Sequence, residues 1–138
     1  MNNGEIIEKV YNSMYRQIQQ SGVAAPVRVL IDLGVLSAAD YERWRFGNLD
    51  YLERVYKVNL HKLAFIMKEV RAYARKSDLK ASWTFYRQWS REGKTSAVKL
   101  CFSKYGSEDV ERSDATYYIS GRRMAELKQP AAADGEKE

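Results

Sequence analysis

The chain contains one cysteine and one histidine, and this scarcity limits the chemistry open to it. Cys101 has no second cysteine with which to form a disulfide within the chain. Since His61 is the only histidine, the chain also lacks the ligands of a standard structural zinc site. Long apolar runs are missing, and the opening residues lack the basic start and apolar stretch of a secretory signal. We therefore expect a cytoplasmic protein without a metal, a cofactor or a membrane contact.

Local motifs of enzymes are also missing from the sequence. No phosphate-binding glycine loop occurs, and His61 and Cys101 have no spacing that marks a base and a nucleophile. The carboxylates of Asp109, Glu111 and Asp114 could be imagined as a cation site, but they lie in a polar segment that is typical of a solvated loop. We therefore interpret the chain as non-enzymatic, with no evident small-molecule substrate.

The length and composition fit one folding unit. A chain of 138 residues with 45% hydrophobic residues can build a single core. The last ten residues are small and charged, with few apolar side chains, which is typical of a disordered tail. We expect one α+β domain over residues 1–128 and a disordered tail over residues 129–138.

Apolar spacing predicts four to five helices in the first half of the chain. The first helix should run to about Gln20 and be stopped by Ser21-Gly22, the second should run from Pro26 to Leu33, and the third should start at the capping residue Ser37 and end at Gly47. A short helical piece follows around Leu52, and Asn59 can cap a longer helix that reaches Lys76. The sequence therefore predicts an N-terminal helical bundle.

Beyond Leu79 the period changes to two, which predicts three antiparallel strands in a meander. The first spans residues 83–89, with Trp83, Phe85 and Trp89 against the helices and Tyr86 as the main exposed ring. The second spans 97–103 and follows a turn at 90–95, and the third spans 116–120 after a polar loop. A short helix is expected near Met124 and Leu127.

Positive charge is concentrated in the middle of the chain, although the net charge is only +5. From Arg43 to Lys104 there are fifteen Lys and Arg against five acids, a net +10, whereas the rest has eight against thirteen, a net −5. A segregated basic region is typical of a polyanion partner such as nucleic acid, although a basic surface without such a partner looks the same in sequence.

The helix from Asn59 to Lys76 carries one apolar and one basic side, which suggests a docking arrangement. Helices followed by a basic hairpin resemble winged-helix organisation in element order only. On this hypothesis the protein binds double-stranded DNA, in preference to RNA, through the helix and the hairpin as a wing. The predicted nucleic-acid contacts are His61, Lys62, Lys68, Arg71, Arg75, Lys76, Arg87, Arg91, Lys94 and Lys99.

Three other interpretations stay open beside this one. The helix, glycine turn and helix between Val27 and Gly47 could read DNA, but Asp40 falls at an inward position, which favours two core helices. The aromatic stretch 83–89 has the composition of a stacking platform for unpaired bases, although its alternation favours a core strand. The protein could instead be a protein-interaction module, an inhibitor or accessory subunit of a nucleic-acid enzyme, anchored by Trp44, Phe65 or Tyr86.

Overall fold

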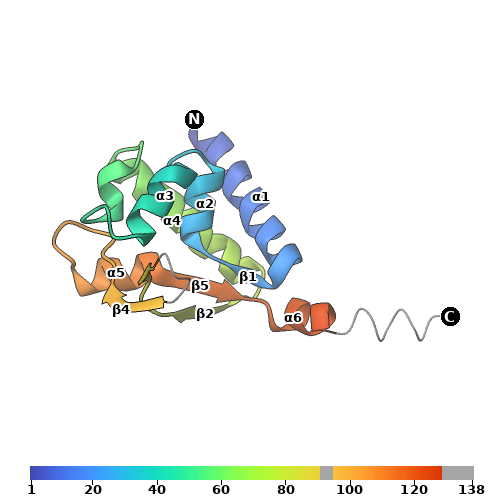
Figure 1. The fold of residues 1–138 in the computed structure, drawn as a ribbon. Helices are drawn as coiled ribbons and strands as arrows, with labels where there is room; N and C mark the ends of the chain where they lie inside the picture. The colour runs from blue at the N-terminus through green and yellow to red at the C-terminus, as the bar shows by residue number, and fades with distance from the viewer. Residues whose placement is uncertain (91–94, 129–138) are drawn as a thin grey trace.

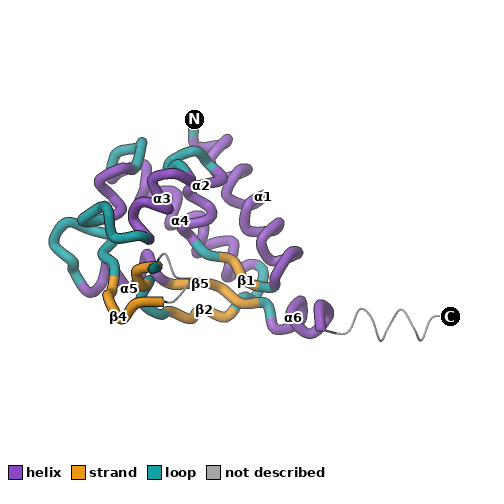
Figure 2. The backbone as a smooth tube through the Cα atoms, viewed as in Figure 1, coloured by secondary structure: helices purple, strands orange, loops and turns teal. Residues whose placement is uncertain are grey.

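The architecture is that of a computed structural model, which describes residues 1–90 and 95–128 apart from the side chains of residues 95–97. The helical elements are α1 (Asn3–Ser21), α2 (Pro26–Asp32), α3 (Ala38–Arg45), the 3-10 turn η1 (Leu52–Val55), α4 (Leu60–Lys76), α5 (Glu108–Ala115) and α6 (Gly121–Lys128), and the strands are β1 (Val23–Ala24), β2 (Lys80–Trp83), β3 (Arg87–Trp89), β4 (Thr95–Lys99) and β5 (Thr116–Ile119). The helices α1 to α4 precede all of these strands except the short β1, and they cover one side of the strands (Figure 1, Figure 2). Within the described residues no helix is long and apolar enough to cross a membrane.

Local capping signals set the ends of the first helices where the sequence predicts them. Ser37 Oγ accepts a hydrogen bond from the backbone N–H of Asp40 at 3.1 Å, and Asn59 Oδ1 accepts one from Lys62 at 2.8 Å. These bonds satisfy amide groups that have no partner inside their helices. Gly22 follows α1 with a φ of 79°, a left-handed conformation that glycine adopts without strain. The predicted helices in this half of the chain are confirmed, with the piece around residue 52 reduced to η1.

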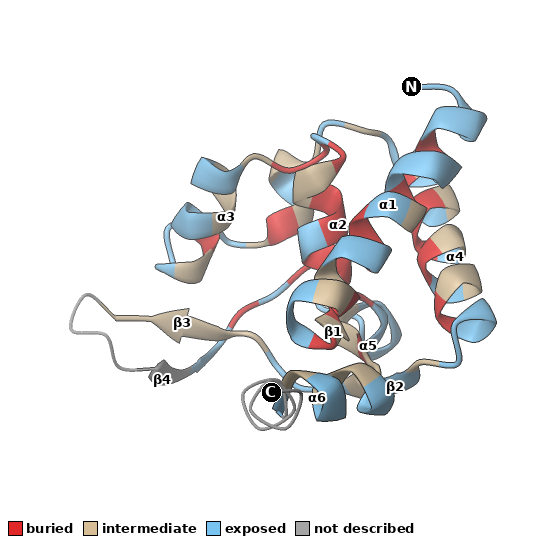
Figure 3. Ribbon diagram, turned by 90° about the vertical axis from the view of Figure 1, so that its right-hand side faces the viewer, coloured by how far each residue is buried: buried red, intermediate tan, exposed pale blue. Residues whose placement is uncertain are grey.

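The helices share one apolar core. α1 and α4 lie side by side, and their buried residues line the faces that meet (Figure 3). Ile6, Val10 and Met14 of α1 are fully buried, as is Ile66 of α4. Each such side chain contributes roughly 1.5 to 3 kcal/mol when removed from water, so this contact holds α4 firmly in place. One side of α4 is thereby fixed inward and the other is left for solvent.

The strands form two small antiparallel sheets. In the first, β5 lies between β1 and β2, so that Tyr118 faces Ala24 on one side and Ala81 on the other. β3 and β4 pair separately as a hairpin, with Arg87 opposite Lys99. The α+β class, a helical part combined with small antiparallel sheets, is confirmed. The pairing differs from a simple meander because β5 returns to the three-stranded sheet while the hairpin extends away from it (Figure 3).

Burial in the aromatic stretch 83–89 differs from the prediction. The chain leaves the three-stranded sheet after Trp83 and pairs again only in β3. Between these strands Tyr86 turns inward and packs against the core, whereas Trp83 and Phe85 keep 37% and 38% of their surface exposed. The predicted single strand with Trp83 and Phe85 facing the helices is wrong, because the irregular segment between β2 and β3 changes which side chains face inward.

Two helices occupy the C-terminal part of the described chain. The polar segment predicted as a loop contains α5, whose first turn carries Glu108, Asp109 and Glu111, and acidic side chains are favoured at a helix N-terminus. The predicted loop is therefore wrong at this point. The short helix expected near Met124 and Leu127 is confirmed as α6. The predicted disordered tail, residues 129–138, lies outside the described residues.

Candidate nucleic-acid interface

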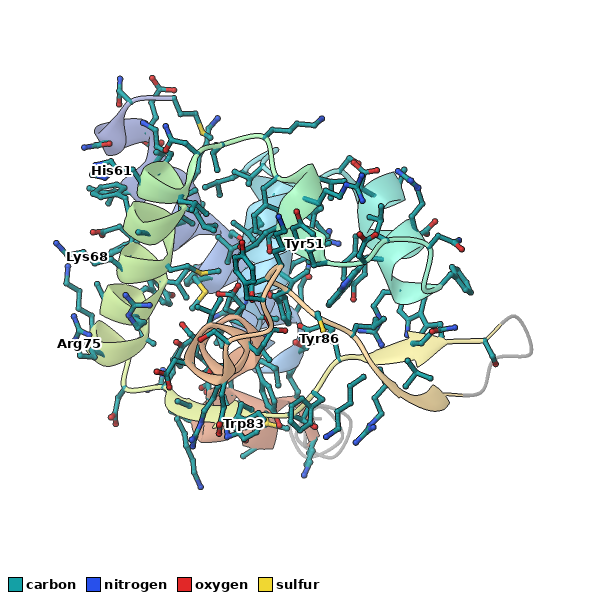
Figure 4. The ribbon with its side chains drawn as sticks, turned by 90° about the vertical axis from the view of Figure 1, so that its left-hand side faces the viewer. Tyr51, His61, Lys68, Arg75, Trp83 and Tyr86 are labelled. Carbon is teal, nitrogen blue, oxygen red and sulfur yellow. The ribbon has the colours of Figure 1, made fainter. Side chains whose placement is uncertain are left out.

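α4 separates an apolar face from a basic one, as its sequence predicts. Its buried residues, Leu63, Ile66, Met67, Val70 and Ala74, face the core. The side chains of His61, Lys68 and Arg75 point away from the body of the molecule and follow the outer side of the helix (Figure 4). Since these three residues span fourteen positions at about 1.5 Å per residue, the basic face is about 21 Å long. We define the α4 basic face as His61, Lys68, Arg71, Arg75 and Lys76.

The cations of this face are not neutralised by ion pairs within the described residues. In residues 1–90 and 95–128 there are six ion pairs, and none involves a residue of α4. Lys68 and Arg75 are exposed. Lys76 Nζ donates to the hydroxyl of Tyr11 at 3.0 Å, and this hydrogen bond raises the pKa of the lysine. The face therefore presents positive charge that no carboxylate of the described chain holds in an ion pair.

Lys62, another predicted contact, is turned away from this role. It is partly buried, and its Nζ donates to the backbone carbonyl of Met1 at 3.1 Å. This bond ties the start of α4 to the N-terminus of the chain. Lys62, like Lys76 with Tyr11, is therefore a member of the predicted set on α4 whose amine already has a partner within the fold.

The hairpin does not continue the α4 basic face. α4 and the β3–β4 hairpin lie at opposite sides of the molecule when it is viewed from either direction (Figure 3, Figure 4). Arg87 and Lys99 face each other across this hairpin, and Arg91 and Lys94 lie outside the described residues. The expected continuous surface of helix and wing is therefore divided into two separate basic regions.

The three side chains predicted to anchor a protein partner are not freely exposed. Trp44 is fully buried, and its indole N–H donates to the carbonyl of Cys101 at 2.8 Å. Phe65 and Tyr86 are partly buried and pack against the core. The prediction of Trp44 as an exposed anchor is wrong, because the apolar ring at this position of α3 fills the space between α3 and the residues that follow β4.

An exposed aromatic pair, missed in the sequence, lies between the two basic regions. Trp83 and Phe85 meet edge to face with their ring centroids 5.1 Å apart. The guanidinium of Arg112 lies 5.0 Å from the centroid of the Trp83 ring, and Lys99 Nζ lies 3.9 Å from that of Phe85. One signal could have found this pair: Arg87 shares their alternation, and an arginine at that position argues against a buried face.

A cluster of carboxylates connects η1 with α5. Glu111 accepts hydrogen bonds from the backbone N–H groups of Phe102 at 2.6 Å and Ser103 at 2.8 Å. Asp114 is buried beside Glu53, and its Oδ2 has no hydrogen-bond partner in the described residues. The interpretation of this acidic segment as solvated surface is wrong for Asp114, because α5 turns its last turn toward the core.

Burial controls the titration of this cluster. The pKa of Asp114 is raised to about 8, chiefly by loss of water and in addition by the charge of Glu53, while Arg71 on α4 acts in the opposite direction. Burial raises the pKa of Tyr56 well above its ordinary value, and the neighbouring carboxylates act in the same direction. Among the described residues no group of acidic, histidine or cysteine side chains could hold a metal ion. The cluster can therefore exchange a proton but offers no metal site in this part of the chain.

Comparison with known proteins supplies no relative. No protein-family model, curated protein or solved structure matches the chain. The functional argument therefore depends on the residues and their geometry.

Proposed function

We propose that the protein binds nucleic acid, with the α4 basic face against the phosphate backbone of a duplex. The observation that carries the proposal is a row of four exposed cations about 12 Å long, Lys68, Arg71, Arg75 and Lys76, in which no residue forms an ion pair in the described chain. Arginines elsewhere, such as Arg43 and Arg54, are paired with neighbouring carboxylates. Cations without such partners are the ones that phosphate can engage without breaking an existing contact.

The role proposed for this face is binding without a chemical step. Lys68, Arg71 and Arg75 contact phosphates, which gives affinity and orientation but carries no sequence information. DNA is favoured over RNA because a helix face, rather than an aromatic sheet, presents this charge. The hairpin is not part of the contact in this proposal, since it lies at the other side of the molecule (Figure 4). A nucleic-acid partner fits the cytoplasmic location expected from the sequence.

A protein partner is the less favoured alternative. Trp44 cannot anchor such a partner, because its ring is fully buried and its indole N–H already donates a hydrogen bond to a backbone carbonyl. Phe65 and Tyr86 are engaged by the core in part. Interface hot spots are usually exposed aromatic or arginine side chains, so the case that Trp44, Phe65 and Tyr86 make for a protein partner is weaker than the sequence indicates.

The test is the salt dependence of binding to a fluorescein-labelled duplex, followed by fluorescence anisotropy. Three phosphate contacts give a slope of about −2.7 for the logarithm of the binding constant against that of salt concentration, or roughly 40-fold weaker binding between about 50 and about 200 mM salt. The variant K68E/R71E/R75E removes these contacts, and we expect it to abolish duplex binding at both concentrations while retaining its fold.

A matched variant separates the face from the overall charge. K9E/K104E/K128E reverses three exposed lysines outside α4, so both variants change the net charge from +5 to −1. We expect this control to retain most of the duplex affinity. Equal losses in the two variants would show that net charge, and not the α4 basic face, determines binding, and absence of duplex binding by the unaltered protein at low salt would end the proposal.

A further inference from the structure

A cavity of about 520 Å³ opens between the three-stranded sheet, the start of the hairpin and the end of α3. It is distinct from the α4 basic face, since no residue of α4 lines it. Its size falls within the range of roughly 300 to 1,000 Å³ that is usual for small-molecule sites. The lining residues are Val23, Ala25, Arg45, Thr84, Phe85, Tyr86, Arg87 and Tyr117. Among these described lining residues two are arginines and none is acidic.

Arg45 gives this cavity an unusual cation. The carbon at the centre of its guanidinium lies 4.5 Å from the centroid of the Trp89 ring and 5.0 Å from that of Tyr86, so the group is held among aromatic rings. Its Nη1 donates to the hydroxyl of Tyr41 at 3.2 Å. Its Nε is buried and has no hydrogen-bond partner, and no ion pair with a carboxylate forms within the described chain.

A buried donor without a partner is costly, and a partly buried guanidinium without a counter-charge is costlier. Arg43, two residues earlier on the same helix, is by contrast paired with Asp40 at 3.0 Å. At Arg45 the fold instead supplies aromatic rings and a cavity. An anionic ligand in the cavity would neutralise the charge of this guanidinium.

The rest of the cavity is suited to a flat aromatic group. Phe85 and Tyr117 contribute rings to the lining, and Phe85 retains 38% exposure. Base stacking on aromatic side chains is worth roughly 1 to 3 kcal/mol per base and tolerates any base. Arg87 lines the same cavity beside this ring, which places a second cation close to the stacking surface. An aromatic ring and a phosphate, linked by a sugar, match this combination.

We propose that the cavity binds a nucleoside phosphate, with the base against Phe85 and Tyr117 and the phosphate on Arg45 and Arg87. The inference rests on the proposed function, which it deepens by naming an unpaired nucleotide as the ligand of a second site. The nucleotide can come from two sources, a free mononucleotide or the unpaired end of a strand whose duplex lies on α4. β2 follows α4 directly along the chain and leads to Trp83 and the cavity, so a strand has a route between the two regions (Figure 4).

The first experiment uses tryptophan fluorescence, because Trp89 contacts Arg45 directly. We titrate the full chain with AMP and dTMP, and in parallel with adenosine and inorganic phosphate, which each lack one half of the ligand. We expect saturable quenching by the mononucleotides and at least tenfold weaker binding of each half. Quenching by none of the four probes would overturn the proposal, and equal binding of phosphate and AMP would refute the stacking part of the site.

Two variants tie the signal to the cavity. R45Q removes the charge with little change in size and F85A removes an exposed ring, and each should weaken AMP binding at least tenfold. R43Q alters an exposed arginine of the same helix that does not line the cavity, and it should bind AMP like the unaltered protein. If R45Q fails to fold, R45K replaces it in the test. Lysine keeps the positive charge but lacks the planar guanidinium, so R45K should also bind AMP more weakly than the unaltered protein. Unchanged AMP binding in folded R45Q and F85A would overturn the assignment.

The second experiment distinguishes the two sources of the nucleotide. A blunt duplex is compared with the same duplex carrying a short 5′-phosphorylated single-stranded overhang. An overhang that improves affinity at least fivefold, with the gain lost in R45Q and blunt-duplex binding unchanged, assigns the cavity to a strand end. AMP binding without any gain from the overhang assigns it to a free mononucleotide.

The failures of the two proposals give different results. Blunt-duplex binding that depends on Lys68, Arg71 and Arg75, without AMP binding or an overhang effect, overturns the cavity and leaves the α4 basic face. AMP binding that depends on Arg45, without any duplex binding, overturns the α4 interface and supports the nucleoside phosphate site.

Discussion

Replacing the buried carboxyl of Asp114 by the neutral amide of asparagine should raise the free energy of unfolding at neutral and alkaline pH. In the native chain this carboxyl lies beside Glu53, near Glu111, and out of contact with water. An acid whose pKa is higher in the folded chain than in the unfolded chain binds more protons when folded. The free energy of unfolding therefore falls as pH rises through the interval between the two pKa values, from about 4 to about 8.

The size of the effect follows from the shift. The pKa of Asp114 rises from 3.8 to about 8, a difference of about 4 units, and each unit corresponds to about 1.4 kcal/mol. The upper limit at pH 8 is thus on the order of 5 kcal/mol, which relaxation of the neighbouring groups will reduce. We expect D114N to be more stable than the unaltered protein by about 2 to 4 kcal/mol at pH 8, and more stable by less than about 1 kcal/mol near pH 4, where the acid is neutral in the folded chain and only about half ionised in the unfolded chain.

Urea denaturation of the two proteins at about pH 4, 6 and 8 measures this difference directly. D109N is the matched control, because Asp109 lies on the same helix but is exposed. The difference between D114N and the unaltered chain should grow with pH, whereas the difference for D109N should stay small. If D114N is equally stable or less stable at pH 8, the carboxyl is not under strain in the folded chain and the reasoning fails.

Three further substitutions test the fold by their effect on the urea midpoint. W44F removes the indole hydrogen bond to the carbonyl of Cys101 and leaves a smaller ring in a fully buried site, and both effects together should cost at least about 1 to 2 kcal/mol; no loss would show that neither contributes. G22A should cost at least about 1 kcal/mol, because a Cβ there would lie 2.4 Å from Met124 Cγ on a backbone with φ of 79°, and an unchanged midpoint would contradict this packing of α6. N59A removes the cap of α4 and should cost about 1 kcal/mol, whereas N59D should retain most of the stability.

The helices could be predicted because their signals are local. The cap at Ser37, the cap at Asn59 and the left-handed glycine after α1 each act within four residues, and the structure places the helix ends there. The two faces of α4 follow in the same way from a spacing of 3.6 residues. The fold class and the basic face of this helix can therefore be predicted from the sequence without knowledge of any tertiary contact.

The sheets could not be predicted to the same extent, because their pairing is not local. β1 has only two residues, too few for an alternation, and it pairs with β5 through Ala24 and Tyr118, which lie far apart in the chain. Alternation in residues 83–89 defines two sets of side chains but not which set faces the core. The segment between β2 and β3 decides that question by turning Tyr86 inward, and nothing in the local pattern signals this turn.

Charge segregation along the chain is likewise not charge segregation in space. The basic middle of the sequence contributes both to α4 and to the hairpin, yet the fold places these elements at opposite sides of the molecule. Arg45 belongs to the same basic stretch, and its sequence neighbours Arg43 and Trp44 give no hint of its role. Only the folded structure distinguishes Arg45 from the other arginines: its guanidinium lies against the rings of Tyr86 and Trp89, and no carboxylate of the described chain forms an ion pair with it. For binding, the informative cations are those that the fold leaves without a partner, because an anionic ligand gains most where the protein has not already neutralised the charge.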